Sequence, residues 1–471
     1  MSTVMEPTTR EERPRIEMTR TTPRSVPLAA ARSTRAVDSD VAVFIGFFFA
    51  VIAGVWAVND GWSGITDGWS GFWRGMASLS GILTSASAMV GLLLAARIPW
   101  TERALGLDRV LIWHRIAGDT MGMLLGLHVL TAVVADMPLR GGLVDTVLDL
   151  TGREPYMALT TVGAAIIGIV VVTSLRNVRN KMSYETWYFV HLTAYVGIVI
   201  SYSHQITLGS MLSGDRLLRW LWGILSAYVL LLVVLGRWTG ILSSVRRPLT
   251  VSSTVRQTPD TVAVTLSGPA LASMSGEAGQ FVVLRILKRG QWWKANPYSL
   301  SAAPTTDGLR ITVKDRGDAS AALFSLREGD RVAVEGPYGS ATPAIFEGAR
   351  PLFIAGGVGV TPVRAMLERL PMDSRPLVLL RARATDDIAH FHEVCRLAEE
   401  RGGDVRLVLG RTVQLKGRDP FAPKLLMSLV PDLHDCVAFV CGPTALTFAA
   451  RKGLLEAGLP KSRVHLELPW W

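Results

Sequence analysis

The stretches that decide the fold are HRIAGDTMGMLLGLH, residues 114–128, and HLTAYVGIVISYSH, residues 191–204. Each stretch is apolar and is bounded by two histidines, His114 and His128 in the first and His191 and His204 in the second. Ionisable side chains are costly inside a bilayer and usually mark function there. A hydrogen-bonded core histidine is the commoner explanation for any one of the four alone. Together they predict two b-type haems stacked across a membrane, each held by one histidine from each stretch.

The spacing also predicts where each imidazole faces. Fourteen residues return His128 to within ~40° of His114 on an ideal helix, about 20 Å further along its axis. Thirteen residues instead rotate His204 by ~220° from His191. The second helix must therefore tilt, distort or end before His204. Polar neighbours favour a frayed helix end at this point: Ser201, Ser203 and Gln205.

The composition indicates a membrane protein. The 471 residues are 49% hydrophobic with a mean hydropathy of +0.31, and the apolar excess lies between about residues 41 and 238. The three cysteines exclude a disulfide framework and leave no iron–sulfur ligand set: Cys395, Cys436 and Cys441. The net charge of +10 could indicate nucleic acid, but the basic residues lie mainly beside apolar segments. The positive-inside rule explains them, so we expect membrane lipid and no nucleic acid as a partner.

Hydropathy divides the N-terminal half into a tail and a membrane domain. Residues 1–40 predict a disordered tail and lack the pattern of a secretory signal. Residues 41–240 are expected to form a transmembrane haem domain whose helices can each cross ~30 Å of hydrocarbon. The six predicted spans are Val41–Val58, Met76–Ala96, Val110–Ala135, Ala158–Leu175, Trp187–Ile206 and Leu217–Leu235. Basic loops after the second, fourth and sixth spans predict a multi-pass plasma-membrane protein with both termini cytoplasmic.

Residues 248–345 change to short alternating strands, which predicts a small antiparallel β-barrel. Its expected strands are Thr250–Gln257, Thr261–Ser267, Gln280–Ile286, Leu309–Lys314 and Arg331–Glu335. Within it lies Asn296-Pro297-Tyr298-Ser299-Leu300. An aromatic ring followed by a hydroxyl can stack on a flavin and hydrogen-bond near its reactive edge. Candidate contacts to the rest of FAD are Lys314, Ser320 before a helix at Ala321–Leu326, and the turn at Gly336-Pro337-Tyr338-Gly339.

Residues 346–471 have the alternating pattern of an α/β nucleotide-binding domain. The strand Pro351–Ala355 runs into a glycine-rich loop and then a helix at Val363–Leu370. Glycines let a backbone approach phosphate groups, so the candidate contacts are Gly356, Gly357, Gly359 and Thr361. The strand Leu377–Leu380 is followed by Arg381 and Arg383. Two explanations fit them about equally well: they bind the 2′-phosphate of NADP, or they are ordinary surface arginines. The strand Val437–Val440 ends in Cys441-Gly442-Pro443.

These motifs resemble the family of ferric reductases and NADPH oxidases over roughly Val41 to Trp471. That family joins a six-helix haem domain to a ferredoxin-reductase-like FAD and NAD(P)H domain, so the expected fold is multidomain: a transmembrane bundle, an antiparallel flavin barrel and an α/β nucleotide domain. The resemblance implies that the four histidines are haem ligands. It implies flavin contacts by Tyr298 and Ser299, with Cys441 near the nicotinamide at hydride transfer.

The chain departs from the family pattern at several positions. Asn296 stands where the family's flavin motif begins with His or Arg, and Lys294 or Arg285 could compensate. The family usually ends in an acidic residue, a spacer and an aromatic that shields the flavin. Here Glu467 is followed by Leu-Pro-Trp-Trp, so the shielding residue would be Trp470 or Trp471. Ala132 occupies the position at which superoxide-forming oxidases carry another histidine.

The resemblance implies transmembrane electron transfer by a flavocytochrome b. NADPH or NADH would reduce FAD, and electrons would pass through the haem at His114/His191 and the haem at His128/His204 to an acceptor outside. Ferric iron as a chelate is the first expectation. Dioxygen reduced to superoxide, or an extracytoplasmic partner protein, are alternatives along the same route. A fourth possibility is that the helices only anchor a soluble flavin reductase.

Overall fold

The computed structural model describes residues 34–467 except 97, 99–104, 106, 153–155, 208–211, 213, 316 and 411–419. Most of the predicted N-terminal tail lies outside these residues. The two predicted flavin-shielding residues, Trp470 and Trp471, also lie outside them.

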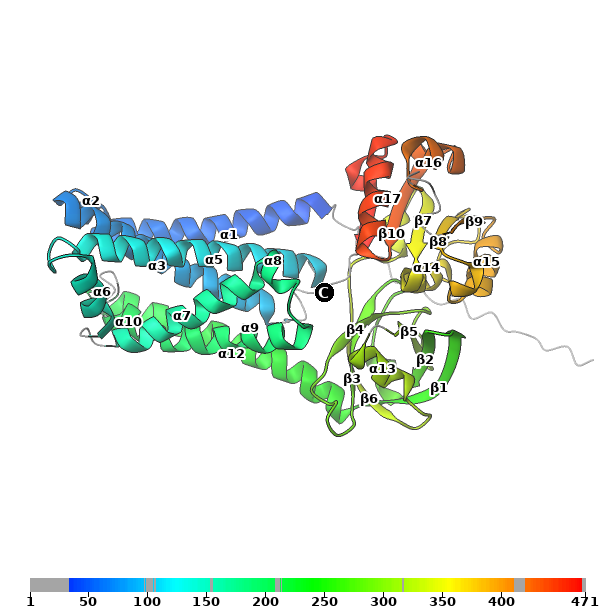
Figure 1. The fold of residues 1–471 in the computed structure, drawn as a ribbon, viewed down its shortest axis with the longest axis horizontal. Helices are drawn as coiled ribbons and strands as arrows, with labels where there is room; N and C mark the ends of the chain where they lie inside the picture. The colour runs from blue at the N-terminus through cyan, green and yellow to red at the C-terminus, as the bar shows by residue number, and fades with distance from the viewer. Residues whose placement is uncertain are drawn as a thin grey trace, which may run out of the picture.

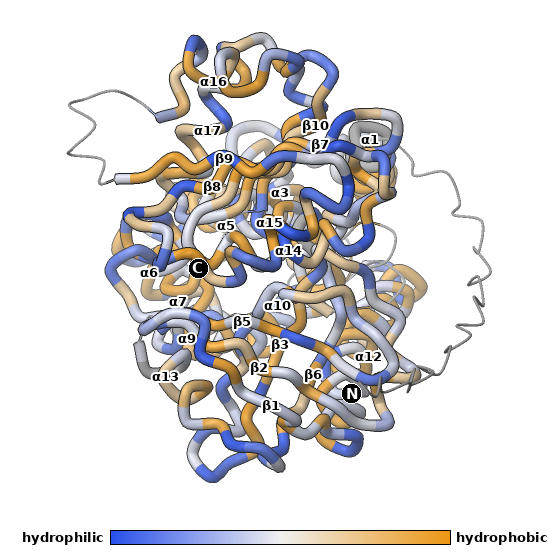
Figure 2. The backbone as a smooth tube through the Cα atoms, turned by 90° about the vertical axis from the view of Figure 1, so that its right-hand side faces the viewer, coloured by the Kyte–Doolittle hydropathy of each residue, from blue (hydrophilic) through white to orange (hydrophobic). Residues whose placement is uncertain are grey.

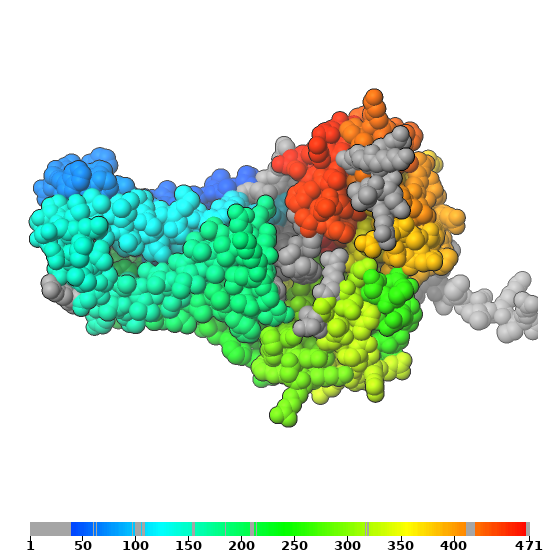
Figure 3. Space-filling view, in the orientation of Figure 1, coloured from blue at the N-terminus to red at the C-terminus, as the bar shows by residue number. Residues whose placement is uncertain are grey.

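The N-terminal half is a bundle of long helices that lie lengthwise beside one another and project from one side of the two sheet-containing units (Figures 1 and 3). Its described elements are α1 Thr34–Trp56, the π-helix Ala57–Gly61, α2 Trp62–Ile65, α3 Gly68–Ala95, α5 Leu107–Asp136, α6 Leu143–Gly152, α7 Met157–Ser174, α8 Arg176–Arg179, α9 Tyr184–Ile200, α10 Tyr202–Thr207 and α12 Arg216–Arg246. Many large apolar side chains on this bundle face outwards, as lipid-facing side chains do.

Within the described residues, five helices are long and apolar enough to cross a membrane: α1, α3, α5, α7 and α12. The predicted fifth span corresponds to α9, which has only 17 residues. A turn at Ser201 separates it from α10, which continues the same path through the bundle. The expected interruption before His204 is therefore confirmed, while a sixth continuous span is not found at this place.

The second unit is an antiparallel six-stranded sheet in the order β4-β3-β6-β1-β2-β5. Its strands are β1 Leu249–Thr258, β2 Thr261–Ser267, β3 Phe281–Ile286, β4 Asn296–Ser299, β5 Leu309–Lys314 and β6 Arg331–Tyr338. The strand β6 runs through Gly336 and Pro337, which were expected to form a turn, because Tyr338 still pairs with Phe281. The short helix α13, Asp318–Phe324, begins earlier than the predicted Ala321.

The third unit is a parallel five-stranded sheet in the order β11-β10-β7-β8-β9 (Figure 1). Its strands are β7 Arg350–Gly356, β8 Leu377–Ala382, β9 Asp404–Leu409, β10 Cys436–Cys441 and β11 Val464–Glu467, and its helices are α14 Val360–Leu367, α15 Phe391–Glu399, α16 Pro423–Leu429 and α17 Thr444–Glu456. The helix α14 begins three residues before the predicted Val363, since a helix tolerates Pro362 in its first turn.

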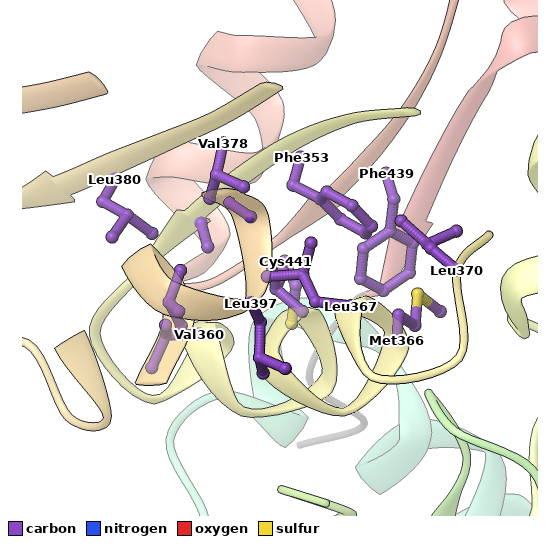
Figure 4. Packing of buried hydrophobic residues seen from close by; sticks show 14 of the residues in the cluster. Phe353, Val360, Met366, Leu367, Leu370, Val378, Leu380, Leu397, Phe439 and Cys441 are labelled. Atoms are coloured by element: carbon purple, nitrogen blue, oxygen red, sulfur yellow. The ribbon is translucent and has the colours of Figure 1, made fainter. Parts of the chain in front are cut away.

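Both sheets are held by continuous apolar cores. The strands of the parallel sheet are coloured as hydrophobic along much of their length (Figure 2), as expected for a sheet covered on both faces. One side of this core packs Phe353, Phe439 and Leu367 between the sheet and α14 (Figure 4). The membrane bundle joins the barrel through α12, which packs against β6. The fold class expected from the sequence is confirmed: apolar helices, an antiparallel barrel and a parallel α/β unit.

Candidate metal and nucleotide sites

The four bundle histidines form two ring pairs. The imidazoles of His114 in α5 and His191 in α9 have ring centroids 6.0 Å apart. The imidazoles of His128 in α5 and His204 in α10 have centroids 6.1 Å apart. The bundle therefore brings the four residues together in the combination that the spacing predicted, one from each of two paths through the membrane.

Each imidazole has a partner for its Nδ1 atom. The Nδ1 atoms of His114 and His128 lie 2.9 Å from the carbonyl oxygens of Gly91 and Ala77 on α3. The Nδ1 of His204 lies 2.5 Å from the Ser201 carbonyl. A carbonyl oxygen can only accept, so these three Nδ1 atoms carry the proton and the Nε2 lone pair is left for a metal. Metal-binding histidines are usually oriented in this way.

The ring separations suit a metal ion between each pair. Metal–imidazole bonds of about 2.0 Å, with each nitrogen roughly 1 Å from its ring centroid, would separate two opposed centroids by roughly 6 Å. Both observed separations agree with this value. A Cβ at Gly118, one turn from His114, would meet no atom within 4 Å, so the space at this point of α5 is open. The residues present therefore fit a flat metal-containing group such as haem.

The approach of α5 to α3 depends on small residues. Gly81 of α3 lies against His128, since a Cβ there would come within 2.9 Å of both Cε1 and Nδ1 of the imidazole. Gly91 is less tightly packed, and a Cβ there would lie 3.9 Å from the Nδ1 of His114. The His128 ring therefore reaches the Ala77 carbonyl only because residue 81 has no side chain.

The position of His204 follows from the helix break. On a continuous helix it would face away from the direction of His191. The regular helix α9 ends at Ile200, and the backbone turns at Ser201 before α10 begins. Close packing of α7 fixes the turn: a Cβ at Gly163 would lie 2.2 Å from the Ser201 Oγ and 2.8 Å from the Gly197 carbonyl oxygen.

The His191 ring is held by side chains, whereas the other three rings are held by backbone carbonyls. The indole of Trp187 stacks on its ring, with centroids 4.9 Å apart and planes inclined by 27°. The Ser174 hydroxyl at the end of α7 lies 3.4 Å from the His191 Nδ1 and accepts a hydrogen bond from the Trp187 indole at 3.4 Å. The Arg179 guanidinium lies 4.6 Å from the Trp187 ring centroid, within cation–π range. The His114–His191 pair is thus held from two further elements.

Apolar side chains separate the two histidine levels. Met121 of α5 and Ile167 of α7 are buried between them, with Leu125, Val171 and Ile198 packed around. Such a dry layer excludes water and ions from the path between the pairs. Arg115, which could pair with a haem propionate, is 62% exposed and lies 3.8 Å from Asp119, at the long end of ion-pair range.

In the barrel, the predicted flavin motif forms strand β4 beside a hollow. The hollow is lined by Leu284 and Ile286 of β3, by Asn296 and Tyr298 of β4, by Ala322 and Leu323 of α13, and by Gln291 and Lys294 of the loop between β3 and β4. Burial raises the pKa of Tyr298 well above its usual value, so the phenol stays neutral and its ring offers an apolar face. Lys294 lines this hollow, so it could replace the His or Arg with which the family's flavin motif begins. Arg285 instead pairs with Glu335 on β6.

The end of β4 meets the C-terminal strand of the nucleotide unit. The Ser299 hydroxyl donates to the Glu467 carboxylate at 2.8 Å, across 168 residues of sequence. Glu467 is paired in register with Cys441 on β10, and the Cys441 thiol also hydrogen-bonds its carboxylate. Burial, first, and Glu467 raise the pKa of Cys441 well above its usual value, so this side chain is a neutral thiol. Figure 4 shows Cys441 within the core packed against α14.

Ser299, the predicted flavin contact, and Cys441, the residue predicted near the nicotinamide, are thus joined through Glu467, which is not one of the predicted site residues. The available signal was its position in the C-terminal motif of the resembling family. That the carboxylate bridges the two domains cannot be predicted from local sequence patterns, because it depends on the parallel pairing of β11 with β10.

The predicted nucleotide loop lies at the point where the strand order of the parallel sheet reverses. Strand β7 is flanked by β8 on one side and by the later β10 on the other. Ligands of open α/β sheets bind at such switch points, beyond the carboxyl ends of the strands. Gly356–Thr361 and Cys441–Pro443 follow these two strands. They touch closely, since a Cβ at Gly359 would lie 2.3 Å from the Cys441 carbonyl oxygen.

Other predicted contacts have partners within the chain. Lys314 pairs with Asp260 at 2.8 Å, and the hydrogen bond from Lys314 is the main cause that lowers the pKa of Asp260 to about 2. The Arg381 guanidinium donates to the carbonyl oxygens of Ala382, Val408 and Gly410, while Arg383 is exposed. The Ser320 hydroxyl donates to the Gly317 carbonyl, and Leu300 is buried in the barrel core. Pro297 pairs with Val283, and Gly336 and Gly339 adopt positive φ. Their roles toward FAD and NADP stay predictions.

Two family models match separate parts of the chain. Residues 80–202 match the ferric reductase like transmembrane component, and residues 353–452 match the oxidoreductase NAD-binding domain. The first match contains His114, His128 and His191 and ends two residues before His204, and the second contains the glycine-rich loop and the cysteine motif. The chain thus combines a membrane component and a nucleotide-binding domain, as its sequence predicted.

The chain is also similar to individual proteins. It is 30% identical over 227 residues to the ferredoxin reductase component of a 3-ketosteroid-9-alpha-monooxygenase from Rhodococcus rhodochrous, covering 47% of this chain and 64% of that protein. It is 26% identical over 208 residues to sulfhydrogenase 2 subunit gamma from Pyrococcus furiosus, covering 40% and 70%. A crystal structure of an Amycolatopsis cytochrome P450 reductase matches with a TM-score of 0.40 and 27% identity, covering 47% and 68%. The chain thus spans about two thirds of the length of these proteins.

Proposed function

We propose that this chain, which joins a ferric-reductase-like transmembrane component to an oxidoreductase NAD-binding domain, carries electrons from NAD(P)H through FAD and two b-type haems across a membrane to ferric iron. The observation that carries the haem assignment is the arrangement of the histidines. The ring centroids of each pair lie at about the separation that one metal requires, and three of the four Nδ1 atoms are bonded to carbonyl oxygens, which leaves the Nε2 lone pair of these three rings free for a metal.

When bound, FAD would accept a hydride from NAD(P)H, and haem iron would carry single electrons. The protein's own contribution is to bind and orient these groups. The glycine-rich loop at Gly356–Thr361 would receive the nucleotide at the switch point of the sheet. Tyr298 offers a neutral aromatic face beside the hollow in the barrel. The Ser299–Glu467 bond joins the end of β4 to β11, whose Glu467 is paired with Cys441 on β10.

In the bundle, the backbone carbonyls of α3 and the turn at Ser201 orient three of the proposed ligands, and Ser174 with Trp187 orients the fourth. The apolar layer at Met121 and Ile167 keeps the space between the two levels dry. Electron transfer needs no general acid or base along this path. The reductase end of the bundle is proposed to face the cytoplasm, because the basic loops lie there.

The purified full-length protein provides the first test. We expect a dithionite-reducible b-type Soret band and about two haems per chain, and a protein without this band would overturn the haem assignment. We call the haem proposed at His114/His191 the inner haem and the haem proposed at His128/His204 the outer haem. His128→Ala is expected to lose the outer haem and the electron flux to an external acceptor. The matched control is His392→Ala, since His392 is an exposed histidine on α15 and its loss should change neither. Unchanged flux in His128→Ala would mean that the helices are only an anchor.

A sided assay identifies the acceptor. The protein is placed in sealed vesicles with NADPH on the reductase side and an impermeant ferric chelate on the other side. Reduction of the chelate under argon supports ferric iron as the substrate. Superoxide formation without iron, with no chelate reduction under argon, would replace iron by dioxygen. Failure with both small acceptors, despite reducible haems, would indicate a protein acceptor.

A further inference from the structure

The loop between β3 and β4, residues 287–295, differs from the rest of the barrel surface. Trp292 is 64% exposed and Trp293 is 41% exposed. Val255 on β1, at 52%, is the other large apolar side chain of the described part of this barrel that is so exposed. Two adjacent exposed indoles indicate a surface that contacts a membrane or another protein.

The loop lies against a membrane helix. The Trp293 ring is 5.7 Å from the ring of Phe189 on α9, with the planes inclined by 48°. Phe189 is itself 51% exposed, and it is only two residues before His191. Because α9 begins at Tyr184, Phe189 lies about 8 Å along the helix, close to the end that meets the barrel. An exposed aromatic at this depth of a membrane helix faces the lipid interface.

The loop that carries the two indoles is also basic. The Lys294 ammonium lies 5.3 Å from the Trp293 ring centroid, Lys288 pairs with Asp330 at 2.6 Å, and Arg289 is exposed. Arg246 and Arg247, both exposed, follow at the end of α12, which packs against the barrel strand β6. Tryptophan with lysine and arginine is the composition that membrane–water interfaces favour, and basic clusters there attract anionic headgroups.

We propose that the loop 287–295 inserts into the anionic headgroup region of the bilayer that the chain's own helices cross. Trp292 faces the lipid, Trp293 packs on Phe189, and the exposed Arg289 binds lipid phosphates. The loop also contributes Gln291 and Lys294 to the hollow beside Tyr298. The contact therefore fixes the position of this hollow relative to α9 and His191. The inference needs only the membrane placement of the helices, so it stands or falls separately from the haem assignment.

Site-directed spin labelling of the full chain in nanodiscs tests the proposal. A nitroxide is attached at Trp292→Cys in a Cys395→Ser background, since Cys436 and Cys441 are buried. The matched control is Val255→Cys, another exposed apolar position of the barrel. It belongs to β1, and this strand lies on the side of the barrel away from the helices (Figure 1). Accessibility is compared between oxygen, which concentrates in lipid, and a water-soluble nickel chelate. Discs of phosphatidylglycerol and of phosphatidylcholine are used.

We expect the oxygen-to-nickel ratio at position 292 to exceed that at position 255 severalfold in phosphatidylglycerol discs, and to fall in phosphatidylcholine discs. Arg289→Glu, with the label retained, should reduce the difference between the two lipids. Equal ratios at both positions in both lipids would overturn the proposal. A label at 292 that is immobile and shielded from both reagents would show a protein partner instead. An oxygen-to-nickel ratio at position 292 that does not depend on lipid charge would overturn the proposal that the loop binds anionic headgroups.

Discussion

At the residue scale, the two histidine pairs differ in how closely α3 packs against them, and the closest contact is at Gly81. We predict that Gly81→Ala disturbs only the outer pair, because its Cβ would lie 2.9 Å from the His128 ring, a distance that forces the imidazole away from the Ala77 carbonyl. Loss of such an orienting contact typically weakens metal binding about 10–100-fold. Haem content and the outer haem's reduction potential, measured by redox titration, check this.

The matched substitution is Gly91→Ala on the same helix. Its Cβ would lie 3.8 Å from the Ala117 Cβ and 3.9 Å from the His114 Nδ1, which are ordinary contact distances. We expect both haems to be retained and the inner potential to be unchanged. Equal losses in Gly81→Ala and Gly91→Ala would show that α3 acts by general packing and not through the orientation of His128.

A second residue-scale prediction concerns the bond between the two reductase units. Glu467→Gln and Ser299→Ala both alter the Ser299–Glu467 bond, which holds the end of β4 at the nucleotide edge. A misplacement of about 1 Å can cost on the order of 100-fold in rate. We therefore expect flavin reduction by NADPH, followed by stopped flow, to slow roughly tenfold to 100-fold, with FAD content preserved. Ser325→Ala, whose hydroxyl bonds only locally to the Ala322 carbonyl, should be silent. If NADPH reduces the flavin of Glu467→Gln at the full rate, Glu467 has no part in the site.

At the scale of elements, the packing of α7 on the α9–α10 break fixes the direction of His204. We predict that Gly163→Ala destabilises this junction, because its Cβ would overlap the Ser201 Oγ at 2.2 Å. Overpacking of this kind costs roughly 1–3 kcal/mol. Thermal unfolding in detergent should shift down, and the outer haem should be lost before the inner one.

The control for this prediction is Gly168→Ala in the same helix. A Cβ there meets nothing within 4 Å, and alanine has a better helix propensity than glycine by about 1 kcal/mol. We expect unchanged or slightly higher stability and normal haem content. If Gly163→Ala behaves like this control, the break at Ser201 is set by α9 alone.

Local patterns were sufficient to predict most of these elements. The alternation of apolar residues located five barrel strands to within a few residues, and the thirteen-residue histidine spacing predicted the break before His204. Boundaries failed where tertiary pairing decides: Gly336 and Pro337 continue β6 because Tyr338 pairs with Phe281. Glu467 was not selected because its bond to Ser299 joins residues that are distant in sequence. Spacing within one chain segment carries no information about such contacts.

At the scale of the whole molecule, a polar network joins the barrel to the nucleotide unit. Arg310 of β5 pairs with Glu393 of α15 at 3.0 Å, and the same carboxylate pairs with Arg364 of α14. His390 links the two units directly: its Nδ1 lies 2.9 Å from Glu393, and its Nε2 lies 2.8 Å from the Thr312 hydroxyl of β5. The network is largely buried, so it couples the relative position of the domains to the charge of these groups.

The pKa values of the network give its pH dependence. The hydrogen bond from His390, first, and then Arg310 and Arg364 hold the pKa of Glu393 below its usual 4.5. Burial is the main cause that lowers the pKa of His390 below 6.5. Unfolding or separation raises both pKa values, so the separated state binds more protons in acid. The stabilisation is therefore complete above about pH 6.5, and it is lost progressively as the pH falls below 6.5 for His390 and below 4.5 for Glu393.

We therefore predict that Glu393→Gln weakens domain contact at neutral pH and flattens the acid part of the stability profile. Removing the carboxylate leaves Arg310 and Arg364 with a neutral amide, which should cost roughly 1–3 kcal/mol after allowance for its partial exposure. Thermal unfolding of the full-length protein at pH values from 4 to 8 measures both effects. Glu399→Gln, an exposed carboxylate on the same helix, is the control and should follow the unmodified protein. A Glu393→Gln profile parallel to that of the control would show that the domains are held by apolar contacts and that the network responds to pH without supporting them.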